Sequence, residues 1–163
     1  MPEIFVISDT HFNHSNIIKY CDRPYSGSNE MDQDMIEKWN SVVHPYDHVW
    51  HLGDVYMKAS KGYIDNILGR LNGKKRLILG NHDNGKDMIL REHFEKIVLW
   101  RVFDKYCLTH IPLPVENIPG DRINVHGHIH QNPAPTERHI NVSVEQIGYT
   151  PINIDELGTL LHS

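Results

Sequence analysis

Five short motifs combine residue types that bind metals or move protons. They are Asp9-Thr10-His11, Gly53-Asp54, Gly80-Asn81-His82-Asp83, the single His110, and Gly127-His128-Ile129-His130. The chain has 13 histidines, nearly as many as its 16 lysines and arginines together. Imidazole and carboxylate together favour Mn, Fe, Zn, Ni or Co over calcium, which prefers a cage of oxygens. The motifs therefore predict a transition-metal site.

The spacing within the motifs allows pairs of side chains to act together. Asp9 and His11 lie two residues apart, as do His128 and His130, and alternate residues of an extended segment face the same way. A carboxylate such as Asp54 can bridge two cations with its two oxygens. Two cations about 3.5–4 Å apart can activate a water and clamp the oxygens of a phosphoryl displacement. A two-metal site is thus the sharpest chemistry that the spacing allows.

Elements that could position these motifs follow from the hydrophobic pattern. Continuous apolar runs predict buried strands, helical spacing predicts amphipathic helices, and alternation predicts half-buried strands. The predicted strands cover residues 3–8, 47–52, 76–79, 97–103, 105–109 and 123–126, with an alternating segment at Ile140, Val142 and Val144. The predicted helices begin at Met31, cover residues 64–71 up to Gly73, and cover residues 86–94.

Each motif follows the end of a predicted strand. In open α/β sheets ligands bind at the carboxyl ends of the strands, so five loops could deliver the motifs to one edge. Glycines before Asp54, Asn81 and His128 fit tight turns in which backbones approach closely. The order βαβαβα followed by mainly β predicts one α/β domain over residues 1–163, with room for a second, more antiparallel sheet.

Composition narrows the class of protein. With 39% hydrophobic and 23% charged residues the chain resembles an ordinary soluble domain rather than a disordered one. A net charge of −5 and the absence of a basic run disfavour extended nucleic-acid binding. No apolar stretch approaches a membrane span, and the acidic start at residues 1–3 disfavours a signal peptide. Two cysteines, Cys21 and Cys107, form no disulfide framework, which favours a reducing cytoplasm.

Each motif alone has an ordinary explanation. An isolated Asp-x-His pair or Gly-Asp turn usually means nothing, Gly-Asn-His-Asp consists of turn-forming residues, and a lone histidine is more often structural. Their joint occurrence, in this order and each at a strand end, favours function. A closed structural zinc site is disfavoured because such sites prefer thiolate ligands.

Together the motifs resemble those of the calcineurin-like metallophosphoesterase superfamily, whose pattern is DxH, GD, GNH[DE], a lone His and GHxH. The match runs from Asp9 to His130 and lacks no motif member. The stretch from Asp9 to His14, followed by Arg23-Pro24, is similar to a group of small bacterial and phage phosphoesterases. The resemblance implies a four-layer α-β-β-α sandwich with two mixed sheets, and a dimetal site at the carboxyl ends of the strands.

The resemblance also assigns roles. Asp9, His11 and His130 would hold one divalent metal. Asn81, His110 and His128 would hold the second, with Asp54 bridging the two. Manganese is the favoured metal, with Fe, Zn, Ni or Co as alternatives. His82 would stabilise the transition state or protonate the leaving oxygen, Asp83 would orient His82, and a hydroxide bridging the metals would attack phosphorus.

Two further residues are candidate substrate contacts. His14 follows the first motif closely enough to touch a substrate. Arg23 could pair with a phosphate oxygen through its fork of donors, although a surface salt bridge is an equal alternative.

The implied function is a phosphoesterase acting on a small phosphoester or nucleotide-like substrate. We expect a phosphodiesterase rather than a phosphomonoesterase, because the chain is small and offers few cations for a dianion; a nuclease is a variant of this reading. The alternative is a non-catalytic metal-binding scaffold or protein-interaction module on the same fold. Such members tend to lose the histidine of the GNH motif, which is present here as His82. Oligomeric state is left open.

Overall fold

A computed structural model describes residues 1–162. The first half of the chain alternates strands and helices. These are β1 (Ile4–Ile7), α1 (Ser15–Tyr20), α2 (Ser28–Val42), β2 (His48–His51), α3 (Lys61–Arg70), β3 (Lys74–Ile78) and α4 (Met88–His93). The second half consists of short strands and 3-10 helices. These are β4 (Lys96–Val98), β5 (Arg101–Phe103), β6 (Tyr106–Leu108), η1 (Val115–Asn117), β7 (Ile123–His126), β8 (His139–Asn141), η2 (Val144–Gln146), β9 (Ile152–Asn153) and η3 (Ile154–His162).

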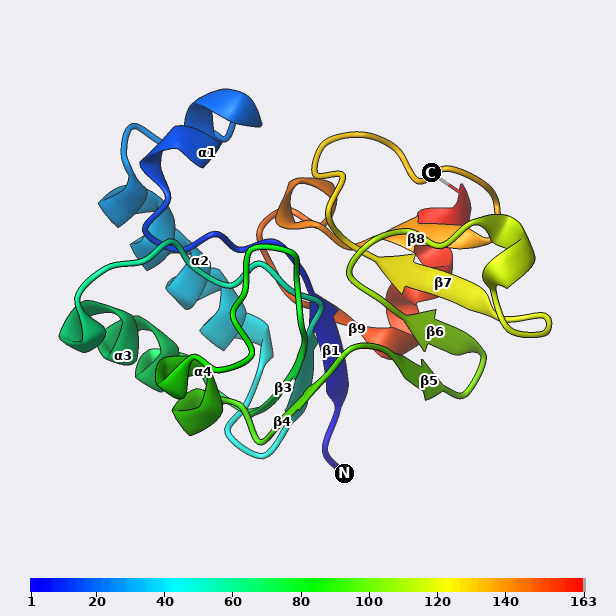
Figure 1. Cartoon of the computed structure of the whole chain (residues 1–163), viewed down its shortest axis with the longest axis horizontal. Coiled ribbons are helices and arrows are strands. Elements are labelled where there is room, and N and C mark those ends of the chain that lie inside the picture. Colours follow the sequence, from blue (N-terminus) through cyan, green and yellow to red (C-terminus); the bar gives the residue numbers. More distant parts are fainter. Residues whose placement is uncertain (163) are drawn as a thin grey trace.

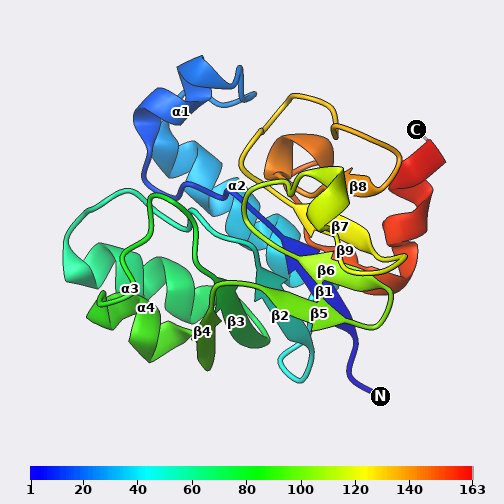
Figure 2. The same ribbon diagram turned by 45° about the vertical axis from the view of Figure 1, so that its right-hand side comes forward.

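The strands form two mixed sheets. The first has the order β4-β3-β2-β1-β9, in which β1 to β4 are parallel and β9 is antiparallel to β1. The second has the order β5-β6-β7-β8, with only β5 antiparallel to its neighbour. Figures 1 and 2 show α2 to α4 on one side of the first sheet and the second sheet on the other. The predicted pair of mixed sheets is confirmed.

Alternation along the central strands fills two cores. On β1, Phe5 and Ile7 pack toward the helices, whereas Val6 belongs to the core shared with the second sheet. The same split separates Val49 from Trp50 on β2. A strand buried on both faces reads as a continuous apolar run because neither face meets water. This explains why these strands could be found from the sequence.

Two predicted strands differ from the structure. Residues 97–103 were expected to form one strand, but they are divided between β4 in the first sheet and β5 in the second. Leu99 and Trp100 make the connection and are largely exposed. The alternating segment ends as a strand at Asn141, and Val144 begins the 3-10 helix η2. In both cases the apolar pattern continues through a change of direction because both flanking segments bury side chains.

Several elements were not predicted from the sequence. They include α1, β9 and η3, which packs against β8, β9 and β1. Within the described residues, all helical turns after α4 are of the 3-10 type. No helix among residues 1–162 is long and apolar enough to cross a bilayer.

Candidate metal centre

The side chains predicted to bind metal gather at the carboxyl ends of β1, β2, β3, β6 and β7. Two groups each place three ligand atoms within 4.8 Å of one another. The first group is Asp9, His11 and His130, and the second is Asp54, His110 and His128. Asp9, His11 and Asp54 follow strands of the first sheet, whereas His110, His128 and His130 follow strands of the second. The two sheets therefore meet along one edge to build a single centre.

The first group converges on one carboxylate oxygen. The Nε2 atoms of His11 and His130 each lie 3.6 Å from Oδ1 of Asp9. Asp9 Oδ1 and His11 Nε2 are both buried and have no hydrogen-bond partner. A buried polar atom without a partner costs about 1–3 kcal/mol. A cation between these atoms would remove that cost, so the residues fit a metal.

Asn81 joins the second group, because its side chain lies close to both histidines. Its Oδ1 lies 2.8 Å from Nε2 of His110 and 3.2 Å from Nδ1 of His128. His110 Nε2 is also 3.4 Å from Oδ2 of Asp54. Ligand atoms held at about 2.0–2.2 Å from one metal lie roughly 3–3.5 Å from each other. The observed separations match that spacing.

Asp54, a member of the second group, also faces the first group. Its Oδ2 is 3.6 Å from Nε2 of His11 and 3.4 Å from Nε2 of His110, one residue from each group. Its Oδ1 accepts a hydrogen bond of 2.9 Å from the backbone N–H of His82. One oxygen therefore faces both candidate sites while the other fixes the loop after β3.

The backbone at these residues occupies a costly region. The φ angle is positive at Asp9 (60°), His11 (48°), Asp54 (58°), His128 (74°) and His130 (52°). Non-glycine residues rarely adopt such angles, and each costs of order 1–3 kcal/mol unless the surroundings enforce it. Five strained residues in one cluster indicate that side-chain placement there is held against local preference.

Close approach of backbones explains two of the predicted glycines. A Cβ atom on Gly80 would collide with Asp54, and one on Gly127 would collide with Ser8 and Asp9. Replacing either glycine would push a candidate ligand out of place. The glycines predicted to allow close approach are thus confirmed in that role.

The electrostatics favour added positive charge. Burial would raise the pKa of Asp9, but the nearby imidazole of His11 and the charges of His110 and His130 outweigh it, so the pKa is lowered. Burial would lower the pKa of His110, but the hydrogen bond to Asp54 and the charge of Asp9 raise it to about 9. The centre attracts protons where no cation is present, as expected of a metal-binding cluster rich in carboxylate.

Arg23 supports the first group from behind and does not face a substrate. Its side chain is buried, with Nε donating to Glu145 Oε2 at 2.8 Å. Its terminal nitrogens donate to the backbone oxygens of Asp9 and Thr10 at 2.7 and 2.9 Å. Every donor that could grip a phosphate therefore faces the protein interior. The structure replaces the expected substrate contact with a structural one.

Glu145 is the residue that sequence reasoning missed. Nδ1 of His130 donates to its carboxylate at 3.1 Å, which leaves Nε2 directed at Asp9. Partners of this kind fix the ring of a metal-binding histidine. The hydrogen bond to His130 and the charge of Arg23 outweigh burial and lower the pKa of Glu145. Its only sequence signal was an acid beside the apolar Val144.

Asp83 differs from expectation in a similar way. Its carboxylate accepts hydrogen bonds from the backbone N–H groups of Asp54 (2.8 Å), Val55 (3.0 Å) and Gly80 (2.8 Å). Among the hydrogen bonds of residues 1–162, none joins it to the His82 ring. Asp83 therefore ties the loops after β2 and β3 together, because unpaired N–H groups there need an acceptor.

His82 and His14 both lie beside the first group. The His82 side chain is exposed, and its ring centroid lies 6.1 Å from that of His11. His14 is partly exposed, and its Nδ1 lies 3.2 Å from Nδ1 of His11. His82 is thus free to reach a bound substrate, whereas His14 already contacts a candidate ligand.

Comparison with known sequences agrees with this geometry. The sequence model of the calcineurin-like phosphoesterase superfamily domain matches residues 3–145. The chain belongs to the calcineurin-like phosphoesterase superfamily. An uncharacterized protein of Methanocaldococcus jannaschii is 38% identical over 99% of this chain and 92% of its own length. The gene 66 protein of Mycobacterium phage L5 is 29% identical over 99% of this chain and 90% of its own.

A solved structure has the same fold. The crystal structure of a protein of unknown function from Aquifex aeolicus is 28% identical and aligns with a TM-score of 0.78. The alignment covers 98% of this chain and all of that one. Membership of the superfamily supports metal-dependent phosphoesterase activity in general, and superfamily members typically bind two divalent metals.

Proposed function

We propose that this calcineurin-like phosphoesterase hydrolyses phosphodiester bonds of a small or nucleotide-like substrate with two divalent transition-metal ions, most favourably manganese. Residues 1–163 would act as one domain. The observation that carries the proposal is Asp54 Oδ2, which lies 3.6 Å from His11 Nε2 and 3.4 Å from His110 Nε2. A shared carboxylate between two ligand groups is the feature that distinguishes a dinuclear centre from two separate sites.

The residues fit the metals by donor type as well as by distance. Asp9, His11 and His130 would hold one ion, Asn81, His110 and His128 the other, and Asp54 both. Two cations held by these residues would activate a water and neutralise charge on the phosphoryl oxygens. Mixed imidazole and oxygen donors suit manganese and its neighbours rather than calcium.

His82 is the proposed catalytic residue of the chain. In the reaction a phosphorus–oxygen bond to water forms and one ester bond breaks, so the leaving oxygen needs a proton. An exposed imidazole beside the first group can donate that proton from a ring nitrogen, or stabilise charge on the phosphoryl group. The backbone N–H of His82 donates a hydrogen bond to Asp54 Oδ1, which holds the residue beside the centre.

The placement of Arg23 supports a diester substrate. A monoester dianion brings more negative charge than a diester, and cationic side chains help to bind it. Arg23 was the nearby arginine that could have served, and its donors are used inside the protein. A diester carries less negative charge that must be compensated and relies mainly on the metals.

Free, buried Cys21 and Cys107 support the further proposal of a reducing, cytoplasmic setting.

The test is a metal-reconstituted screen. Metal-free protein is supplied with Mn²⁺, and kcat/KM is compared for bis-p-nitrophenyl phosphate and p-nitrophenyl phosphate, then for cyclic nucleotides and short single-stranded DNA. We expect faster cleavage of the diester. A monoester preference would overturn the diester assignment. No hydrolysis with Mn, Fe, Zn, Ni or Co would overturn the enzyme assignment and favour a scaffold.

A further inference from the structure

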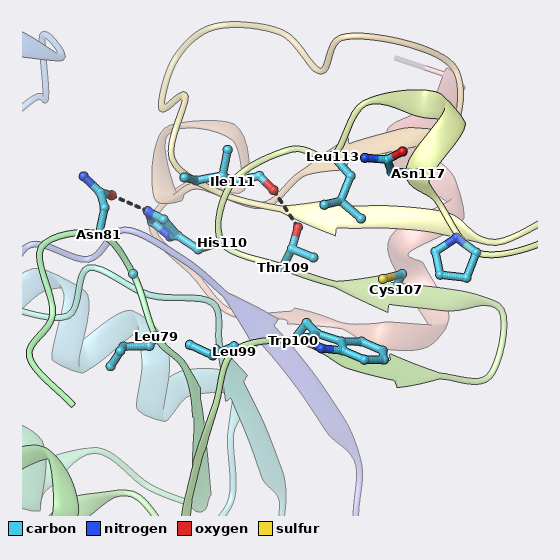
Figure 3. Close-up of a pocket in the computed structure, with 12 residues that line it drawn as sticks. Leu79, Asn81, Leu99, Trp100, Cys107, Thr109, His110, Ile111, Leu113 and Asn117 are labelled. Atoms are coloured by element: carbon cyan, nitrogen blue, oxygen red, sulfur yellow. Dashed lines mark hydrogen bonds between the residues drawn. The ribbon is translucent and has the colours of Figure 1, made fainter.

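An apolar pocket opens directly from the second ligand group. It has a volume of about 610 Å³, and Asn81 and His110 form one end of it (Figure 3). Trp100, Leu113 and Asn117 lie further along the pocket in the same view. A group bound at the metals would therefore lie next to this pocket.

The lining of the pocket exposes apolar side chains to water, which is energetically unfavourable. Leu99, Trp100 and Ile111 line the pocket and are 73%, 60% and 50% exposed. Leu99 and Trp100 are the connection between β4 and β5, where the chain passes from one sheet to the other. Contiguous exposed apolar surface beside a polar centre indicates a binding site.

The chemistry of the lining defines the occupant. Among the described residues, none that lines the pocket is Asp, Glu, Lys or Arg. A charged group would lose hydration there and meet no carboxylate, ammonium or guanidinium group. Trp100 offers a large exposed ring, on which flat aromatic groups stack well. The pocket is thus suited to an uncharged aromatic ring.

A second hollow has charged side chains in its lining, which the first pocket lacks. It measures about 480 Å³, and its lining includes His82, Asp83, Asp87, Lys58 and Lys61. His82, the proposed proton donor to the leaving oxygen, lines this polar hollow and not the apolar pocket. The leaving arm of a diester therefore belongs on the polar side, and the retained arm on the side of Trp100.

We propose that the pocket between Trp100 and Leu113 binds a flat, uncharged aromatic ring carried on the retained ester arm of the substrate. A nucleobase and a simple aryl group share this chemistry. The inference rests on the proposed phosphodiesterase function. To that function it adds a class of substrate, namely diesters with an aromatic ring on the retained arm. The ring would strengthen binding through the pocket, while hydrolysis would occur at the metals.

The test varies only the retained arm. Methyl, phenyl and thymidine 5′ p-nitrophenyl phosphates share one leaving group, so differences in kcat/KM report the other arm. We expect the phenyl and thymidine diesters to exceed the methyl diester about tenfold or more, mainly through KM. Preference for thymidine alone would identify a nucleobase, and equal preference an aryl ring in general. Equal rates for all three would overturn the proposal.

Two variants locate the effect. Trp100→Ala should bring the phenyl-to-methyl ratio close to one, and Trp100→Phe should retain part of it. Tyr46→Ala is the control, because Tyr46 is also an exposed aromatic residue, at 79%, but precedes β2 at the opposite edge of the sheet. A ratio that survives Trp100→Ala, or that falls equally in Tyr46→Ala, would contradict the assignment.

A binding measurement separates this inference from the activity. Trp39 and Trp50 are buried, so Trp100 is the exposed tryptophan of the chain. Phenylphosphonate should change tryptophan fluorescence of the Mn²⁺-loaded protein at a concentration at least tenfold lower than methylphosphonate. If binding shows this preference but no diester is cleaved, only the catalytic proposal fails. If diesters are cleaved without it, only the pocket assignment fails. Self-association lost in Trp100→Ala, with no ring preference, would mean that a second copy covers the pocket.

Discussion

The two ligand groups differ in the residues that support them and in the surface onto which they open. The first group is backed by Glu145 and Arg23, and Asp9 is fully buried. The second group includes the exposed Asn81 and opens onto the apolar pocket. A ligand set held by buried partners loses little entropy when a metal binds. We therefore expect the first site to hold its metal more tightly than the second.

The largest effect is expected where the two groups join. Asp54→Asn removes the shared negative charge while keeping the shape of the side chain. Both sites should lose affinity, and activity should fall by more than the roughly 100-fold typical of losing a supporting residue. Elemental analysis after dialysis measures metal content. Two metals retained at wild-type affinity would show that the groups are independent.

Next in size is the effect of His82 on the substrate side. His82→Ala should lower kcat on the order of 10²-fold or more, as expected when a general acid or electrostatic contact is lost. Metal content should stay at the wild-type value, because no ring nitrogen of His82 belongs to either ligand group. A variant with nearly normal kcat would remove His82 from the mechanism.

A more selective change separates the two groups. Glu145→Gln weakens the partner of His130 and should reduce metal affinity of the first site about 10–100-fold, leaving the second unchanged. Asn81→Ala should reduce the metal affinity of the second site and leave that of the first unchanged. Calorimetric titration of Mn²⁺ into each variant measures both sites, with exposed Glu116→Gln as the control. Equal weakening of both sites by Glu145→Gln would erase the distinction between the groups.

The smallest effect concerns His51, which lies behind both groups. Its ring donates to Thr10 Oγ1 and accepts from the backbone N–H of Gly53, and burial lowers its pKa to about 3. Between pH 6.5 and 3 the unfolded chain binds a proton at this site that the folded chain does not, so acidification reduces the free energy of unfolding. The slope approaches about 1.4 kcal/mol per pH unit.

Replacing His51 should flatten that dependence. In metal-free protein, urea unfolding of wild type and His51→Gln from pH 6.5 to pH 5 should show the wild type losing about 1.5 kcal/mol more. Identical slopes would mean that His51 is not held neutral in the fold.

The parts of the fold that could be predicted are those set by patterns of neighbouring residues in the sequence. The buried strand β1 is a continuous apolar run, and β3 ends with the apolar pair Leu77 and Ile78. Motifs lie just after both strands, so a shared edge could be predicted. The turn of the chain at Leu99 and Trp100 could not be predicted, because apolar residues flank it on both sides. That turn is the reason an apolar pocket exists beside the centre.

The contacts that support the ligands could not be predicted from the sequence either. Arg23 and Glu145 are 122 residues apart in the chain, and no local pattern links a basic residue near the first motif to an acid after the last. Asp83 stands in a motif, yet its partners are backbone N–H groups of another loop. Residue type and spacing can indicate which side chains bind a metal, whereas the residues that hold them depend on the tertiary fold.

One measurement tests the central claim most directly. Metal-free protein is titrated with Mn²⁺ while heat and hydrolysis of bis-p-nitrophenyl phosphate are followed together. The account predicts two binding steps, a tighter one at Asp9, His11 and His130 and a weaker one at the second group, with activity appearing in the second step. A single equivalent of bound metal with full activity, or full activity before any metal is added, would contradict it.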